Sequence, residues 1–282
     1  MTQKPFTAFP DQGLQFLRSL KRHNNREWFQ RHKSIYEQYV KQPMTDLITA
    51  LAQEFQQFAP EMLASPRTSA YRIHRDTRFS KNKSPYKTHV AAVFPRSGLG
   101  KHEGAAFYLH IAPEELLIGG GLYMPLPEDL RAVRNHIAEN PDTFFSIVEQ
   151  RGFLRIFGSV EGERLQRVPP GFPQDHVAAH YLKYKQFLAG RNFPPDVATT
   201  RRFYKLILET FKAMLPLVRF LNDPIVRSRR LKERQTAFFE LGVIRGQTPN
   251  SPTSASFCVP RTYNLLHVRS HYRCTPPGRM FR

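Results

Sequence analysis

The chain is 282 residues long, 40% of them hydrophobic, and carries a formal net charge of +19. It contains no apolar run of the ~18 residues that a membrane-spanning helix requires, which excludes a membrane span. Its two cysteines, Cys258 and Cys274, lie near the C-terminus, which excludes a disulfide framework or a cysteine-based metal site in the rest of the chain. No secretory signal is visible at the start, and we expect a cytoplasmic protein.

The N-terminal part of the chain predicts three helices within residues 11–59. Asp11 is placed to cap the first helix, and Asn24-Asn25 to cap the second. Pro43 suits the first turn of the third helix, whose apolar residues form one stripe at helical spacing. A helical layer is therefore expected before any strand.

From about residue 69 the hydrophobic period changes from about 3.6 residues, typical of helices, to about 2, typical of strands. Four strands are predicted between residues 69 and 124, the first over residues 71–79. The short link Pro113–Glu115 makes the last two antiparallel, because a parallel crossover needs about a dozen residues or more. Helices return over residues 127–221. This order predicts an α+β fold, with an antiparallel sheet of about four or more strands flanked by N- and C-terminal helices.

The composition divides the chain into a single α+β domain over residues 1–226 and a basic tail over residues 227–282. The tail contributes +9 to the net charge and has turn-forming composition without periodicity. We expect it to be disordered and to add no folded domain. A read-through or shifted reading frame is an alternative origin for it. The domain itself is only moderately basic, so overall charge alone does not indicate nucleic-acid binding.

Residues 71–89, YRIHRDTRFSKNKSPYKTH, concentrate positive charge. Self-repulsion at this density costs folding free energy, and a bound anion would offset that cost. The one carboxylate, Asp76, lies between two arginines and would orient their guanidinium groups for a phosphate or carboxylate. The cations are Arg72, Arg75, Arg78, Lys81, Lys83 and Lys87.

We therefore predict that a phosphate-bearing ligand, a nucleotide or nucleic acid, binds on the exposed face of the sheet. Arg75 alternates onto the apolar side of the predicted strand, where it could instead anchor a buried carboxylate. The predicted contacts are five cations and two tyrosines on which a base could stack: Arg72, Arg75, Arg78, Lys83, Lys87, Tyr86 and Tyr123.

Three glycines, Gly119–Gly121, end the predicted fourth strand just before Tyr123. Their bare backbone could approach a ligand closely, which adds Gly120 and Gly121 to the predicted contacts. The structural alternative is a bulge, or a position where a neighbouring side chain packs against bare backbone. The residues that follow do not match a Walker loop.

Three other interpretations of the basic segment remain open. A charged edge strand would deter aggregation without binding a ligand. An enzyme acting on a small anionic substrate would use His74 or Asp76 to transfer a proton, and the arginines to stabilise developing charge. An interaction module would dock an acidic partner protein. A concave pocket favours the enzyme, a long basic groove favours nucleic acid, and a flat patch favours the partner protein.

No cofactor and no metal site are predicted. His74 and Asp76 share a face of the predicted first strand, and His89 and His110 lie on the following strands, but the arginines on that face would repel a metal cation. The sequence also lacks a nucleophile elbow, so a covalent mechanism finds no support.

The segment RIHRDTRFSKNKSPYKTH resembles the signature of a bacterial and fungal family known only as a domain of unknown function. Further similar motifs are Asn24–Phe29, FYLHIAP followed by Gly119–Tyr123, PPGFPQDH and YLKYKQF. The resemblance covers about residues 5–226. It implies an α+β fold, but it supplies no activity, cofactor or catalytic residue.

Overall fold

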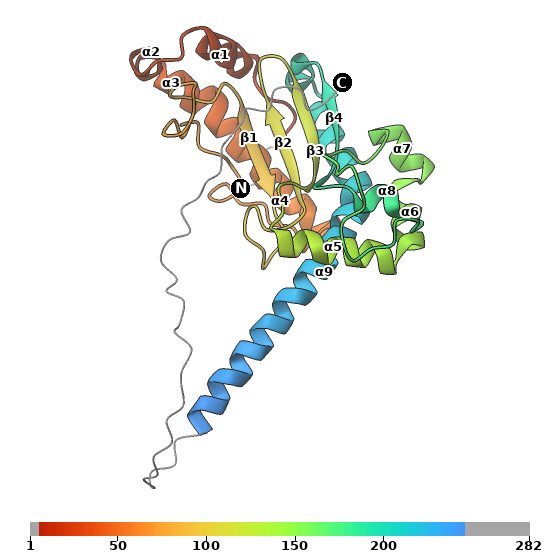
Figure 1. Cartoon of the computed structure of the whole chain (residues 1–282). Coiled ribbons are helices and arrows are strands. Elements are labelled where there is room, and N and C mark those ends of the chain that lie inside the picture. Colours follow the sequence, from red (N-terminus) through yellow and green to blue (C-terminus); the bar gives the residue numbers. More distant parts are fainter. Residues whose placement is uncertain (1–5, 246–282) are drawn as a thin grey trace, which may run out of the picture.

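The computed structural model describes residues 6–245, with side chains described for residues 6–237. Neighbouring strands pair antiparallel throughout the sheet, and Figure 1 shows helices before and after it. The predicted α+β fold is therefore confirmed. The sheet contains four strands in chain order: β1 (Val90–Phe94), β2 (Ala106–Ile111), β3 (Leu116–Leu122) and β4 (Phe187–Phe193).

The helices before the sheet begin close to where the sequence predicts them. The side chain of Asn25 caps α2 by accepting a hydrogen bond from the backbone N–H of Trp28 at 2.8 Å. Pro10 occupies the cap position of α1, whereas Asp11 lies in its first turn, where a negative charge is favourable. The elements are α1 (Asp11–Arg22), α2 (Arg26–Arg31), α3 (Lys33–Tyr36), the π-helical turn η1 (Glu37–Lys41) and α4 (Gln42–Phe58).

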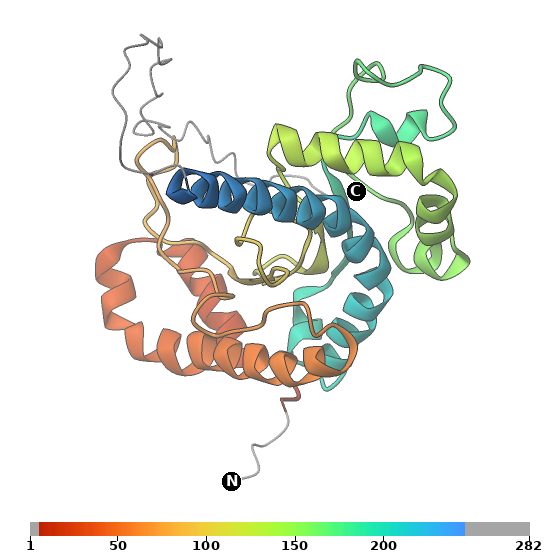
Figure 2. The same cartoon turned by 90° about the horizontal axis from the view of Figure 1, so that it is seen from below.

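Four short helices separate β3 from β4, and a long helix follows β4. The helices α5 to α7 gather at the β4 end of the sheet, away from α1 to α4 (Figure 2). Pro216, which we expected to kink or end a helix, lies inside the long helix without ending it, as does Pro224. The elements are α5 (Pro127–Glu139), α6 (Pro141–Val148), α7 (Arg151–Phe157), α8 (Ala179–Leu182), the 3-10 helix η2 (Pro195–Thr199) and α9 (Phe203–Arg245).

The main core lies between one face of the sheet and the helices α4 and α9. The ring of Phe107 on β2 stacks on Phe211 of α9, with 4.6 Å between centroids. Phe55 of α4 contacts Phe94 of β1 at 5.4 Å, edge to face. Because successive strand residues point to opposite faces, these aromatic rings leave their strand neighbours, such as Tyr108, on the other face. That second face carries the candidate site.

The first predicted strand, residues 71–79, is not a strand. Instead, residues 69–93 form an irregular hairpin whose returning arm ends in β1, with isolated pairing of Ala70 with Ala92 and of His74 with Tyr86. The backbone of residues 69–75 pairs with that of residues 85–93, and the hydrogen bond furthest out joins the N–H of Arg75 to the carbonyl of Pro85. Residues 76–79 alternate in sequence but have no neighbouring strand to pair with in the described part of the chain. The fourth strand of the sheet is β4, far beyond the predicted limit of residue 124.

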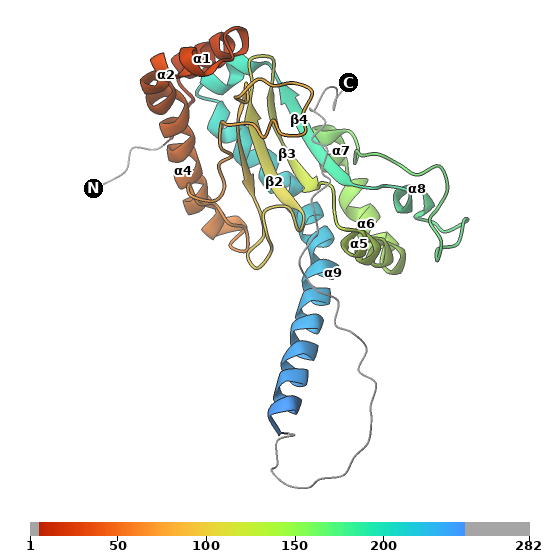
Figure 3. The same cartoon turned by 60° about the vertical axis from the view of Figure 1, so that its left-hand side comes forward.

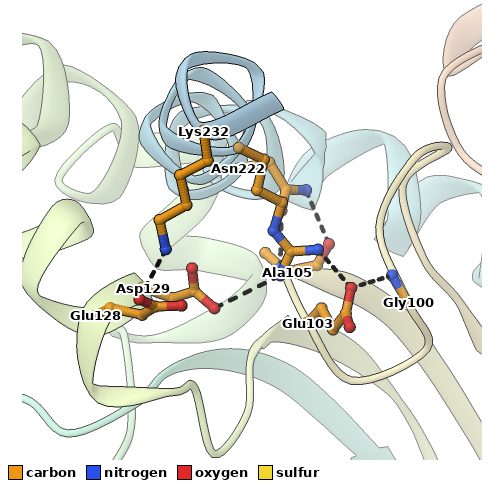
Figure 4. Close-up of polar contacts among 8 residues, drawn as sticks. Gly100, Glu103, Ala105, Glu128, Asp129, Asn222 and Lys232 are labelled. Atoms are coloured by element: carbon orange, nitrogen blue, oxygen red, sulfur yellow. Dashed lines mark hydrogen bonds and ion pairs between the residues drawn. The ribbon is translucent and has the colours of Figure 1, made fainter. Parts of the chain in front are cut away.

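The helix α9 continues through residue 226, the predicted end of the domain, to Arg245. The start of its protruding half is tied to the rest of the fold (Figure 4). The buried amide of Asn222 exchanges two hydrogen bonds of 2.8 Å with the backbone of Ala105, and Arg229 pairs with Glu103 and lies 3.7 Å from Asp129. The predicted boundary thus falls inside a helix.

The part of the tail beyond α9, residues 246–282, lies outside the described residues, so the predicted disorder there stays a prediction. Within residues 6–245, no helix combines the length and the apolar composition that crossing a membrane requires.

Candidate functional site

The sheet face opposite to α4 and α9 carries a pocket of about 340 Å³. Val93, Tyr108 and Gly119 lie side by side across its floor, one from each of the first three strands. The hairpin before β1 and the loop between β1 and β2 form its walls, and Figure 3 shows chain crossing this side of the sheet. The polar and aromatic lining residues are Tyr71, Lys87, His89, Lys101, His102, Tyr108, His110, Glu115 and Tyr123.

Two lysines meet over one aromatic ring in the wall of the pocket. The ammonium nitrogens of Lys101 and Lys87 lie 3.9 and 4.9 Å from the ring centroid of Tyr71. Lys101 is held there because it also donates hydrogen bonds to the carbonyls of Thr68 and Ala70, at 2.9 and 3.3 Å. Burial, and then the charge of Lys87, lower the pKa of Lys101. Such a pair of cations is stabilised by an anion that contacts both.

Two histidines lie deeper in the pocket, with 5.5 Å between the ring centroids of His89 and His110. Burial lowers the pKa of each to about 4, and for His89 the nearby His110, Lys87 and Arg75 add to this effect. Both rings are therefore neutral near pH 7. A neutral imidazole can donate one hydrogen bond and accept another.

Both nitrogens of His110 have hydrogen-bonding partners in the pocket. Its Nδ1 lies 3.3 Å from the Tyr108 hydroxyl, and its Nε2 lies 3.2 Å from Glu115 Oε1. With Glu115 ionised, its carboxylate can only accept, so Nε2 carries the ring proton and donates to it, and Nδ1 accepts from the Tyr108 hydroxyl. Burial raises the pKa of both Tyr108 and Glu115. Glu115 is the one acidic group among the described residues that line the pocket.

The structure brings four of the residues predicted from sequence to the pocket: Lys87, Gly120, Gly121 and Tyr123. Gly120 also fits the structural alternative, a position where neighbouring atoms pack against bare backbone. A Cβ atom there would lie 2.1 Å from the carbonyl oxygen of Ala106 and 3.0 Å from Met214 Sδ, so bare backbone is needed for packing.

The other predicted contacts do not line the pocket. Tyr86 is buried and stacks on Phe29 at 4.1 Å between centroids, so it offers no free face to a base. The remaining cations lie along the hairpin towards its tip: Arg72, Arg75, Arg78 and Lys83.

The two predicted proton-transfer residues, His74 and Asp76, also lie outside the pocket and are exposed. Asp76 accepts hydrogen bonds from Arg78, from Nε at 3.0 Å and from a terminal nitrogen at 2.7 Å. This contact with Arg78 lowers the pKa of Asp76 to about 2. The predicted pairing therefore forms with Arg78, and Arg72 adds a weaker electrostatic contribution.

Several pocket residues were not predicted as contacts. On β2, Tyr108 and His110 alternate with buried Phe107 and Leu109, and polar residues at every second position of a buried strand are a signal that could have been read. Lys101 lies in a loop without periodicity, and nothing in the sequence links it to Tyr71.

His89 and His110 do converge, but the part of the chain that the structure describes holds no group of three metal-ligating side chains that could hold an ion.

The fold and site define an α+β protein with a pocket, lined in part by lysine, histidine and tyrosine side chains, on the sheet face opposite to α4 and α9. Residues 12–220 match the family model described as conserved hypothetical protein (DUF2461), and the chain belongs to this family. No curated protein matches the sequence.

Proposed function

We propose that this protein binds a small phosphate-bearing ligand, of about the size of a mononucleotide, in the sheet-face pocket. The observation that carries the proposal is the pair of ammonium groups, Lys87 and Lys101, over the ring of Tyr71. Among the described residues that line the pocket, the one carboxylate is that of Glu115, which hydrogen-bonds to His110. Pockets that hold small ligands typically span about 300–1,000 Å³, and the volume here lies in that range.

The shape of the pocket supports a ligand with a flat ring. Gly119 and Gly121 leave bare backbone in its floor, and Leu117 and Leu188 flank them. A phosphate held by the lysines would leave the rest of the ligand on this floor, within reach of the exposed ring of Tyr123. Compared with the prediction from sequence, the proposal keeps the ligand class and the contacts Lys87, Gly120, Gly121 and Tyr123, and it replaces the other predicted cations by Lys101.

A second candidate function is an enzyme that acts on the bound anion. The hydrogen bond of His110 to Glu115 supports it, because a carboxylate that orients a neutral imidazole is a common arrangement in general acid–base catalysis. In this version His110 replaces His74 and Asp76 as the proton-transfer group. Turnover of a bound compound, followed by ³¹P NMR, should be lost in His110→Gln while binding persists. Equal turnover in both proteins would contradict this role.

The binding proposal can be tested by a thermal-shift screen of the full chain against mononucleotides, sugar phosphates and inorganic phosphate. A ligand at 100 times its dissociation constant should stabilise the protein by about 2.7 kcal/mol, which is a shift of roughly 5–10 °C for a domain of this size. Lys101→Ala should abolish the shift. The control Arg78→Ala/Lys83→Ala, at the hairpin tip, should retain it. If none of these anions shifts the wild type, or if Lys101→Ala responds as the wild type does, the proposal is wrong.

A further inference from the structure

The hairpin of residues 69–93 connects the pocket to a basic tip. Near its base, Tyr71, Lys87 and His89 line the pocket. Further out, the positive charge of Arg75 acts on His89, and the Arg75 guanidinium lies 3.5 Å from the hydroxyl of Ser80 at the tip. Positive charge is therefore continuous from the pocket, through Arg75, to the tip. A ligand confined to the pocket would leave most of this charge unused.

The hairpin is held in a defined position on the N-terminal helices. The amide of Asn24 donates to the carbonyl of Tyr86 at 3.0 Å and accepts from its N–H at 3.1 Å. Phe29 of α2 stacks on the Tyr86 ring. Because the returning arm is anchored at Tyr86 before any ligand arrives, binding along this part of the hairpin costs little additional ordering.

The tip combines cations with an exposed aromatic ring. Phe79 is 76% exposed. The guanidinium of Arg78 lies 5.9 Å from its ring centroid, oriented by the ion pair with Asp76. Lys81 and Lys83 follow on the same turn, both exposed. Charged side chains alone would deter aggregation at a strand edge, whereas an exposed phenylalanine favours it.

We infer that the natural ligand is a single-stranded nucleic acid whose terminal nucleotide enters the pocket and whose following phosphates run along the hairpin to its tip. The inference rests on the proposed function and extends it to a longer ligand. Arg75 lies four residues further along the hairpin than Tyr71, at most about 13 Å along the chain, and Arg78, Lys81 and Lys83 follow beyond it. Cations that lie between one aromatic ring at the base, Tyr71, and one at the tip, Phe79, suit the phosphates and stacking bases of a single strand. A lone phenylalanine provides no apolar patch of the kind that favours a membrane surface.

The test measures competition binding to the full chain by AMP and by unlabelled adenylate oligomers of two, four and ten nucleotides, as RNA and as DNA. Affinity should rise at least about tenfold from AMP to the longest oligomer. In Arg72→Ala/Lys81→Ala, the slope of log affinity against log salt for the oligomer should fall by about 1.4, and Phe79→Ala should weaken oligomer binding by about tenfold. Both variants should bind AMP as the wild type does.

The matched control is Arg151→Ala/Arg155→Ala, which removes two exposed arginines from α7, and it should bind the oligomers normally. Three results would overturn the inference and leave the proposed function standing. The first is that oligomers bind no tighter than AMP, and the second is that the control variant loses as much affinity as Arg72→Ala/Lys81→Ala. The third is that polyglutamate competes as well as the oligomers. Tip-dependent binding to phosphatidylserine vesicles without oligomer binding would also overturn it, in favour of a membrane surface. If neither AMP nor any oligomer binds, the proposed function and the inference both fail.

Discussion

The two histidines of the pocket, His89 and His110, are the residues whose ionisation depends most on the fold. Each lies largely buried on or beside the sheet, and each is neutral because its surroundings solvate a charge poorly. The charged groups near the two histidines have opposite signs. Lys87 and Arg75 oppose a positive charge on His89, whereas Glu115 accepts a hydrogen bond from His110. The native state therefore resists protonation of both rings, which the unfolded chain does not.

We expect the free energy of unfolding to fall between about pH 6.5 and pH 4. In this window the histidines of the unfolded chain bind protons, whereas those of the native state, with pKa values of about 4, do not. Protonation therefore favours the unfolded chain, and stability that is present above about pH 6.5 is lost as the pH falls. From pH 7 to pH 5 each histidine should account for about 2 kcal/mol.

Urea unfolding at the two pH values, compared between wild type and His110→Gln, isolates the contribution of His110. Carboxylates outside the pocket that titrate in the same range act in both proteins and largely cancel in the comparison. If the variant lost as much stability as the wild type on acidification, protonation of His110 would not be the cause.

At the scale of elements, the packing of β3 against α9 depends on glycine. Gly120 pairs with Phe107 on one side and Ala189 on the other, and faces Met214 of α9. Its missing side chain lets the helix and the neighbouring strand approach. Gly190 of β4 lies on the pocket face, where a Cβ atom would meet Leu117 Cδ1 at 3.3 Å, the end of a flexible side chain.

Alanine at these two glycines should therefore have unequal effects. Gly120→Ala should lower the free energy of unfolding by about 2–3 kcal/mol, because its methyl group would overlap the carbonyl oxygen of Ala106. Gly190→Ala should change it by less than about 1 kcal/mol, since a small loss of space is offset by a less flexible unfolded chain. Chemical denaturation of both variants checks the difference. Similar losses in the two would show that the close approach of Ala106 and Met214 to Gly120 is not what requires glycine.

At the scale of the whole molecule, α9 joins the core to a protruding arm. The family match ends at residue 220, and the helix continues beyond it. The ionised form of Asp129, a buried residue on α5, is stabilised by this continuation of the helix. Burial raises the pKa of Asp129, and the charge of Arg229 is the largest effect that opposes the rise. One Asp129 oxygen, Oδ2, has no hydrogen-bond partner and lies 3.7 Å from that guanidinium.

Removal of Arg229 should leave a buried carboxylate without the strongest of its counter-charges. Arg229→Met should lower the free energy of unfolding at pH 7 by about 1–3 kcal/mol. The exposed neighbour provides the control, and Arg230→Met should stay within about 0.5 kcal/mol of the wild type. The double variant Arg229→Met/Asp129→Asn should recover part of the loss. If it were no more stable than the single variant, the buried charge would not be the reason.

Much of the fold could be predicted because its signals are local. The change of hydrophobic period near residue 69, the prolines in the first turns of α4 and α5 and the cap at Asn25 depend on residues within a few positions of one another. Alternation by itself was misleading in residues 71–79, because a strand also needs a partner and none runs beside the hairpin tip. β4 was missed because its contacts with β3 are distant in the sequence.

By itself the sequence determined the class of fold, the antiparallel order of β2 and β3, and the concentration of cations in one segment, since composition and period are properties of neighbouring residues. Only the tertiary structure decided which of those cations share a pocket. Lys87 and Lys101 come from separate loops, and they meet at Tyr71 because the hairpin and the β1–β2 loop fold over the same sheet face. Burial in the pocket, rather than any motif, makes His89 and His110 neutral. The same fold leaves the hairpin tip in solvent.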